Sequence, residues 1–170
     1  MRASGLSPGL LSSLAVMLFI LPSGAADSMA ELQARFDRET NAVRKAKLVE
    51  KLGDAQFEEA RRAGKEGDHG TVGLTMEKYR DNVRAALETL KKQHPDAERQ
   101  SNGYRQLQFH VRRGIREVEE TLLMAPDPYK PPLEIVHKDL IEMDDELIKL
   151  LFPLHPAKPR ATPPSPEKQP

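Results

Sequence analysis

Residues 71–93 read TVGLTMEKYRDNVRAALETLKKQ, and their apolar side chains recur at alternating steps of four and three. Such a pattern places one apolar stripe along one face of an α-helix. Its members are Val72, Met76, Tyr79, Val83, Ala86 and Leu90. Because these steps are typical of antiparallel helical bundles, the segment predicts a helix that packs against other helices.

Three further segments carry a similar apolar spacing. They run from Met29 to Ala60, from Tyr104 to Leu122 and from Leu133 to Leu150. No β-branched run alternates with polar residues between these positions, so strands are not indicated. The sequence therefore predicts an all-α fold, an antiparallel helical bundle of four to five helices within residues 27–152.

Glycine and proline mark the ends of the predicted helices. Three glycines within residues 64–70 indicate a loop, and Thr71 is a suitable N-cap for the helix that follows. Pro95 ends that helix, and four prolines within residues 125–132 predict a stiff turn before the last one. We expect the long first helix, residues 28–64, to be kinked or broken near Gly53.

The first 26 residues have the pattern of a secretory signal peptide. An apolar run over residues 10–21 follows Arg2, and Pro22 then precedes small residues. The run is shorter than the roughly 20 residues that a membrane-spanning helix needs. We therefore expect cleavage after Ala25 or Ala26, a periplasmic or secreted bacterial protein, and no stable membrane insertion after cleavage.

The C-terminal segment, residues 153–170, contains seven of the 14 prolines of the chain. Proline fixes φ and removes a backbone donor, so these residues cannot continue a helix. The segment therefore predicts a disordered tail outside the bundle, which would serve as a spacer or as a ligand for a partner.

The composition excludes several classes of function. The 26 basic side chains balance the 26 acidic ones, so the chain is not a strongly basic nucleic-acid binder, and no nucleic-acid partner is expected. The chain has no cysteine, which excludes disulfides, thiolate metal sites and a cysteine nucleophile. An exported chain without disulfides also fits a bacterial source better than a small eukaryotic secreted domain.

Charge is unevenly divided between the last two predicted helices. Residues 104–116 are basic, whereas residues 139–146 contain five acidic side chains. If the two helices form a hairpin, Arg112 lies opposite Asp144, and such pairs guide the choice and direction of the neighbouring helix. Arg112 and Asp144 are therefore interaction candidates, together with His69, whose imidazole could bind a ligand in the glycine loop.

Glu134 and His137 are the weak candidates for a metal site. Their spacing places both on one face of a helix, as in di-iron carboxylate bundles. The only similar spacing, Glu66 with His69, lies in the glycine loop, so a complete ligand set is missing. No pattern pairs a methionine with a histidine as axial haem ligands, and no cofactor is expected.

No motif of a catalytic site, a phosphate-binding loop or a calcium loop occurs in the chain. We therefore expect a helical protein-interaction or adaptor module without catalytic activity. Its partner would be a protein of the cell envelope or a second copy of the chain. The alternative is a metal- or haem-binding four-helix bundle of the periplasm.

Overall fold

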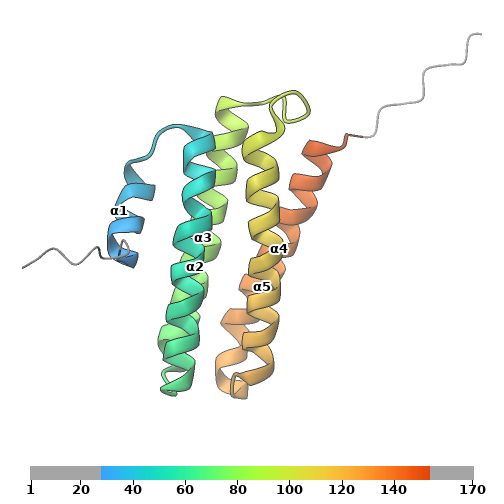
Figure 1. The fold of residues 1–170 in the computed structure, drawn as a ribbon. Coiled ribbons are helices and arrows are strands. Elements are labelled where there is room, and N and C mark those ends of the chain that lie inside the picture. The colour runs from blue at the N-terminus through green and yellow to red at the C-terminus, as the bar shows by residue number, and fades with distance from the viewer. Residues whose placement is uncertain (1–27, 154–170) are drawn as a thin grey trace, which may run out of the picture.

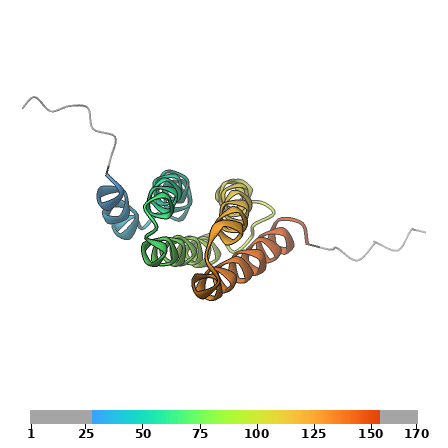
Figure 2. The same cartoon turned by 90° about the horizontal axis from the view of Figure 1, so that it is seen from below.

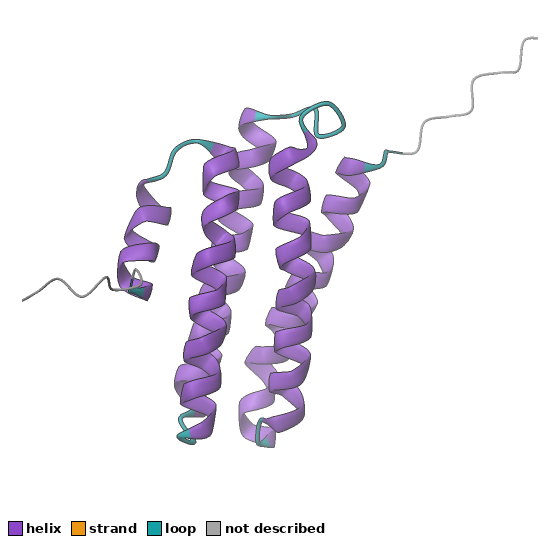
Figure 3. Cartoon of the chain, in the orientation of Figure 1, coloured by secondary structure: helices purple, strands orange, loops and turns teal. Residues whose placement is uncertain are grey.

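The computed structural model describes residues 28–153, and the regular elements in this range are all helices (Figure 1, Figure 3). Five α-helices follow one another, with one short 3-10 helix before the last. Their bounds are α1 Met29–Arg38, α2 Ala42–Lys65, α3 His69–Gln93, α4 Ser101–Met124, η1 Asp127–Tyr129 and α5 Lys130–Leu151. The predicted all-α fold is confirmed.

Helices α2 to α5 run up and down beside one another, and α1 lies at the edge (Figure 1). Helix α2 packs against α3 and α4, and α5 packs against the same two helices. Helix α1 packs along α2 in the opposite direction, so α1 and α5 occupy opposite edges of the molecule (Figure 2). Helix α1 thus packs on α2, and its Gln33 side chain reaches α3, where Nε2 donates to Oδ1 of Asn82 at 3.1 Å.

The predicted apolar stripes meet inside the bundle. All six stripe residues of α3 are at most 3% exposed, and Tyr79 and Tyr104 are the largest fully buried side chains. Apolar side chains off the stripes divide into two groups. Phe57 is fully buried and widens the core, whereas Leu74 and Phe109 remain about two-thirds exposed on the surface, at 69% and 71%.

The first predicted helix is interrupted at residues 39–41, and the break expected near Gly53 was wrong. Glu39 and Asn41 have extended backbones, with ψ of 121° and 123°. The side-chain oxygen of Asn41 accepts a hydrogen bond from Arg44 N at 3.0 Å, which starts α2. The interruption therefore depends on an asparagine cap.

The linker between α1 and α2 is held by one side chain of α3. The Nε2 atom of Gln93 donates to the carbonyl of Thr40 at 2.6 Å, and its Oε1 accepts from Ala42 N at 3.0 Å. These bonds fix the turn that lays α1 against α2. Leu32 and Phe36 of α1 are buried there, at 5% and 2% exposure.

Gly53 lies in the middle of α2 because its neighbours leave no room for a side chain. A Cβ atom here would lie 2.3 Å from Cε1 of His110 and 2.9 Å from Cε2 of Tyr79. The glycine therefore permits close packing of α2 against two ring-bearing neighbours.

The other helix ends follow local hydrogen bonding. The prediction that Thr71 caps α3 was wrong. The N-cap is Asp68, whose carboxylate accepts from Thr71 N at 3.0 Å and from the Thr71 hydroxyl at 2.7 Å. Helix α5 begins at Lys130, with prolines in its first turn, and ends at Leu151, shortly before Pro153.

The predicted signal peptide, residues 1–26, lies outside the described residues, as does the tail after Pro153. Among the helices of residues 28–153, none combines the length and the apolar character that a membrane span requires.

Candidate functional site

The predicted pairing of α4 with α5 is present. Nε of Arg112 lies 3.3 Å from Oδ2 of Asp144, whose side chain is 15% exposed. Nearer the turn of the same hairpin, Nε2 of His137 lies 3.1 Å from Oε1 of Glu119. The two contacts fall in one register, so Arg112 and Asp144 help to align the two helices.

The two metal candidates, Glu134 and His137, have different surroundings. Glu134 is exposed, and His137 contacts Glu119 of the neighbouring helix. In residues 28–153, no group of three or more histidine, aspartate and glutamate side chains is close enough to hold a metal ion. The geometry therefore supplies His137 with one carboxylate neighbour across the hairpin.

His69 is the first residue of α3 and lies at the end of the bundle where the chain passes from α2 to α3. Its ring packs against Tyr129, with the ring centroids 5.2 Å apart. Its side chain also borders a mostly apolar pocket of about 290 Å³ between the ends of α2, α3 and α4, together with Lys65 and Met124. His69 is half-buried in this position.

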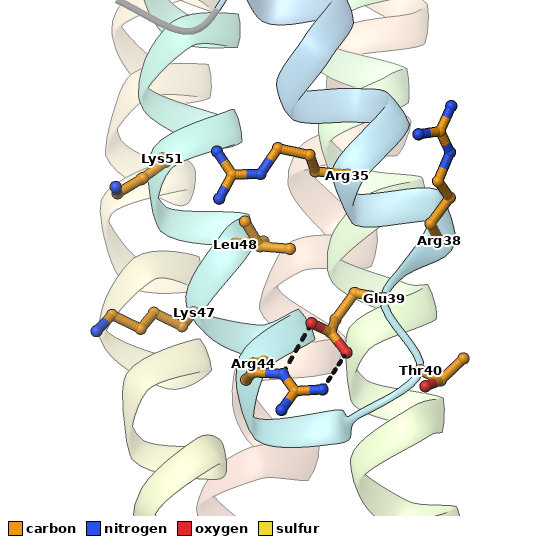
Figure 4. A pocket seen from close by; sticks show the side chains of 8 residues that line it. All are labelled: Arg35, Arg38, Glu39, Thr40, Arg44, Lys47, Leu48 and Lys51. Atoms are coloured by element: carbon orange, nitrogen blue, oxygen red, sulfur yellow. Dashed lines mark hydrogen bonds and ion pairs between the residues drawn. The ribbon is translucent and has the colours of Figure 1, made fainter.

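A wider cleft than the one beside His69 lies elsewhere, between α1 and α2 (Figure 4). We call it the basic groove. Its volume is about 550 Å³, and five basic side chains and one carboxylate line it. The lining residues are Arg35, Arg38, Glu39, Thr40, Arg44, Lys47, Leu48 and Lys51. The groove is thus strongly positive although the chain as a whole is neutral.

The carboxylate of the basic groove is fully occupied by its neighbours. Nε and Nη2 of Arg44 donate to the two oxygens of Glu39 at 2.9 and 3.1 Å, and Asn41 N donates at 2.8 Å. These contacts, the Arg44 hydrogen bond first, lower the pKa of Glu39 from 4.5 to about 2. Glu39 therefore stays ionised and fixes the end of the groove.

Three other cations of the groove have no carboxylate partner among the described residues. Arg38, Lys47 and Lys51 are exposed, and within residues 28–153 no carboxylate lies within ion-pair distance of them. Lys47 and Lys51 lie on one face of α2, one turn apart. A basic face on α2 is visible in the sequence, but its partner wall on α1 depends on the turn at residues 39–41.

A buried polar cluster connects α2, α3 and α4. The Tyr79 hydroxyl donates to the backbone oxygen of His110 at 3.0 Å and lies 3.0 Å from Nδ1 of the same residue. Nε2 of His110 lies 3.4 Å from Oδ1 of Asp54, which also binds Nη1 of Arg113 at 2.7 Å. The ring of Phe57 stacks on His110, with centroids 5.6 Å apart.

The electrostatics of this cluster favour uncharged rings. Burial lowers the pKa of His110, which is 5% exposed, against an opposing effect of Asp54. Burial also raises the pKa of the Tyr79 hydroxyl. The neutral imidazole of His110 helps to position the three helices that enclose it. In the sequence, only two glycines, Gly53 and Gly114, indicate the close packing around this cluster.

Known proteins provide no relative that would assign a role to these residues: no family model, no curated protein and no solved structure matches the chain. The functional argument therefore rests on the geometry of the chain itself.

Proposed function

We propose that this chain is a non-catalytic interaction module that binds an acidic segment of a partner protein in the basic groove. The observation that carries the proposal is the placement of Arg38 on one side of the groove and of Lys47 and Lys51 on the other, all three without a carboxylate partner among residues 28–153. Oppositely charged surfaces attract one another and accelerate association. An electrically neutral chain that concentrates positive charge in one place is suited to a specific acidic partner.

The shape of the groove favours a peptide segment. Arg38 lies on the α1 side, whereas Lys47 and Lys51 lie on the α2 side, with Leu48 between the walls (Figure 4). Lys47 and Lys51 are four residues apart, about 6 Å along the helix axis. Acidic side chains one turn apart on a bound helix match this spacing, and an apolar side chain can contact Leu48.

We also propose that the module acts in the periplasm or outside a bacterial cell. The support is the signal-peptide pattern of residues 1–26 and the absence of cysteine from the chain. Sequencing the N-terminus of the protein recovered from the cell envelope tests this proposal. A mature chain starting at Ala26 or Asp27 supports it, and an intact Met1 contradicts it.

The basic groove is tested with a fluorescent oligo-glutamate of about 12 residues, long enough to cover the cationic face of α2. Fluorescence anisotropy measures its affinity for the protein and for the double variant Lys47→Glu, Lys51→Glu. Exposed ion pairs contribute about 0–1 kcal/mol each, so we expect roughly a tenfold loss of affinity. Binding should also weaken as salt is raised.

A matched variant separates local from overall charge. Lys138→Glu with Lys149→Glu changes the net charge by the same amount, but on α5 at the opposite edge. This control should bind the peptide nearly as the unmodified protein does. Equal losses in both variants would refute the groove. Tighter groove-dependent binding of a single-stranded oligonucleotide or of anionic vesicles would assign a different class of partner.

A further inference from the structure

A second cavity lies on the other flank of α1, where this helix approaches α3. Its volume is about 310 Å³, and its exposed lining is mostly apolar. Three helices contribute to it. The lining residues are Met29, Ala30 and Gln33 of α1, Gln56 of α2, and Leu74, Thr75 and Lys78 of α3. It shares no residue with the basic groove.

One of the residues that line the cavity, Gln56, carries a buried hydrogen-bond acceptor without a donor. Gln56 is 2% exposed, and within residues 28–153 its Oε1 atom has no hydrogen-bond partner. Nearly all buried polar atoms in proteins are hydrogen-bonded, because an unpaired one has lost water without replacement. An acceptor of this kind at the wall of a cavity indicates a ligand that brings a donor.

The other amide side chain that lines the cavity, Gln33, cannot supply that donor. Nε2 of Gln33 already donates to Oδ1 of Asp37 at 2.9 Å and to Oδ1 of Asn82 at 3.1 Å. Its Oε1 accepts from Nδ2 of Asn82 at 3.0 Å. The Gln33–Asn82 pair therefore joins α1 to α3 and leaves Gln56 unsatisfied.

The rest of the cavity suits an aromatic ring. Met29 and Leu74 are large apolar side chains that are 39% and 69% exposed at its border. Methionine sulfur makes favourable contacts with aromatic rings. Lys78 is exposed, and among the described residues no carboxylate lies within ion-pair distance of it, so its ammonium is available to the face of a ring.

We propose that this cavity, which we call the indole cavity, binds a tryptophan side chain of a partner protein, with the indole N–H donating to Oε1 of Gln56. Phenylalanine lacks a donor, whereas indole carries one N–H donor and no acceptor, which matches a single unpaired oxygen. The chain contains no tryptophan, so the occupant belongs to a different protein. The inference is independent of the basic groove.

The absence of tryptophan from the chain makes the test direct, since only the probe carries indole fluorescence. The protein is titrated into N-acetyl-tryptophanamide while emission wavelength and anisotropy are recorded. We expect saturable binding with a blue shift as the ring leaves water. The analogue methylated on the indole nitrogen should bind roughly five- to tenfold more weakly, because it cannot donate to a buried acceptor.

Two glutamine variants form a matched pair. Gln56→Leu replaces the unpaired amide with an apolar side chain of similar size, so it should fold and should no longer distinguish the two probes. Gln106→Leu also removes a buried, unpartnered Oε1, but on α4 beside Phe109, and should retain the preference. Binding without preference for the N–H probe, a preference that survives Gln56→Leu, or no saturable binding would overturn the proposal. Lys47→Glu with Lys51→Glu should leave this binding unchanged.

Discussion

Replacing Gly53 with alanine distinguishes a glycine that weakens a helix from one that permits close packing. In an unobstructed helix interior, the change stabilises a protein by roughly 0.5–1 kcal/mol. Here the added methyl group would lie 2.3 Å from Cε1 of His110 and 2.9 Å from Cε2 of Tyr79. We therefore expect the opposite sign, a net loss of stability.

The surroundings of the two rings determine the magnitude. The Tyr79 hydroxyl lies 3.0 Å from Nδ1 of His110, and the ring of Phe57 stacks on the His110 imidazole. The rings of Tyr79 and His110 therefore cannot move independently. Overpacking a closely packed core costs about 1–3 kcal/mol. After the gain in helix propensity is subtracted, Gly53→Ala should lower the free energy of unfolding by about 0.5–2 kcal/mol.

Urea denaturation followed by far-ultraviolet circular dichroism measures this change. We expect the midpoint to fall by roughly 0.25–1 M, given typical denaturant slopes. Gly73→Ala is the control, because a Cβ atom at this helical position has Cγ of Pro132 as its nearest contact, at 4.0 Å. That variant should raise the midpoint. If Gly53→Ala also raises it, the close contact of α2 with His110 is wrong.

Three further predictions concern charged and titrating groups. Because burial lowers the pKa of His110, the folded protein binds fewer protons than the unfolded chain near pH 6, and stability falls as the pH drops below about 6.5. His110→Phe should reduce this fall, measured by urea denaturation at several pH values; an unchanged pH profile would contradict it. Reversing Arg112 and Asp144 together should restore the stability, at most about 1 kcal/mol, that either single reversal removes; a double-mutant cycle without coupling would exclude their contact. The pKa of Glu39 lies near 2, so the stability that its contact with Arg44 contributes is complete above pH 4.5 and is lost as the pH falls toward 2. A carboxyl titration by NMR with a midpoint near 4.5 would refute that contact.

The fold could be predicted from the sequence because its main determinants are periodic. The stripe from Val72 to Leu90 has the spacing of a helix face, and the structure buries all of it. The register of α4 on α5 was also accessible, because the opposite charges of Arg112 and Asp144 select a partner helix. These signals lie within a segment or between neighbouring segments of the chain.

The turn between α1 and α2 was missed although its local signals are present. Ser28 and Glu31 form a capping box at the start of α1, and Asn41 caps α2. No glycine or proline lies within residues 39–41, where the helix is interrupted, whereas Gly53 has the sequence pattern of a helix break. Only tertiary contacts show that Gly53 accommodates His110, which lies far along the chain.

Both candidate sites depend on that missed turn. The basic groove lies on the α2 flank of α1, and the indole cavity lies on its α3 flank. Neither surface exists if residues 28–64 continue as one helix. The sequence therefore contains every lining side chain but predicts neither site, since their proximity arises from three residues of linker.

Helix α1 is consequently a shared wall, and Phe36 is its main anchor. Phe36 is 2% exposed, beneath the ammonium of Lys45 at 4.5 Å from the ring centroid. Truncating a buried phenylalanine costs about 3–5 kcal/mol, and a helix of ten residues is marginal without packing. We expect Phe36→Ala to release α1 while α2 to α5 remain folded.

Hydrogen exchange should show this release as lost protection confined to residues 29–38. Oligo-glutamate and N-acetyl-tryptophanamide should then both bind more weakly, whereas the variants at Lys47 and Lys51 affect only the first probe and Gln56→Leu affects only the second. A joint loss with the bundle intact would establish α1 as the wall common to both sites. If only one affinity falls after release of α1, the site that keeps its affinity is formed by the bundle alone, and its proposed lining by α1 is wrong.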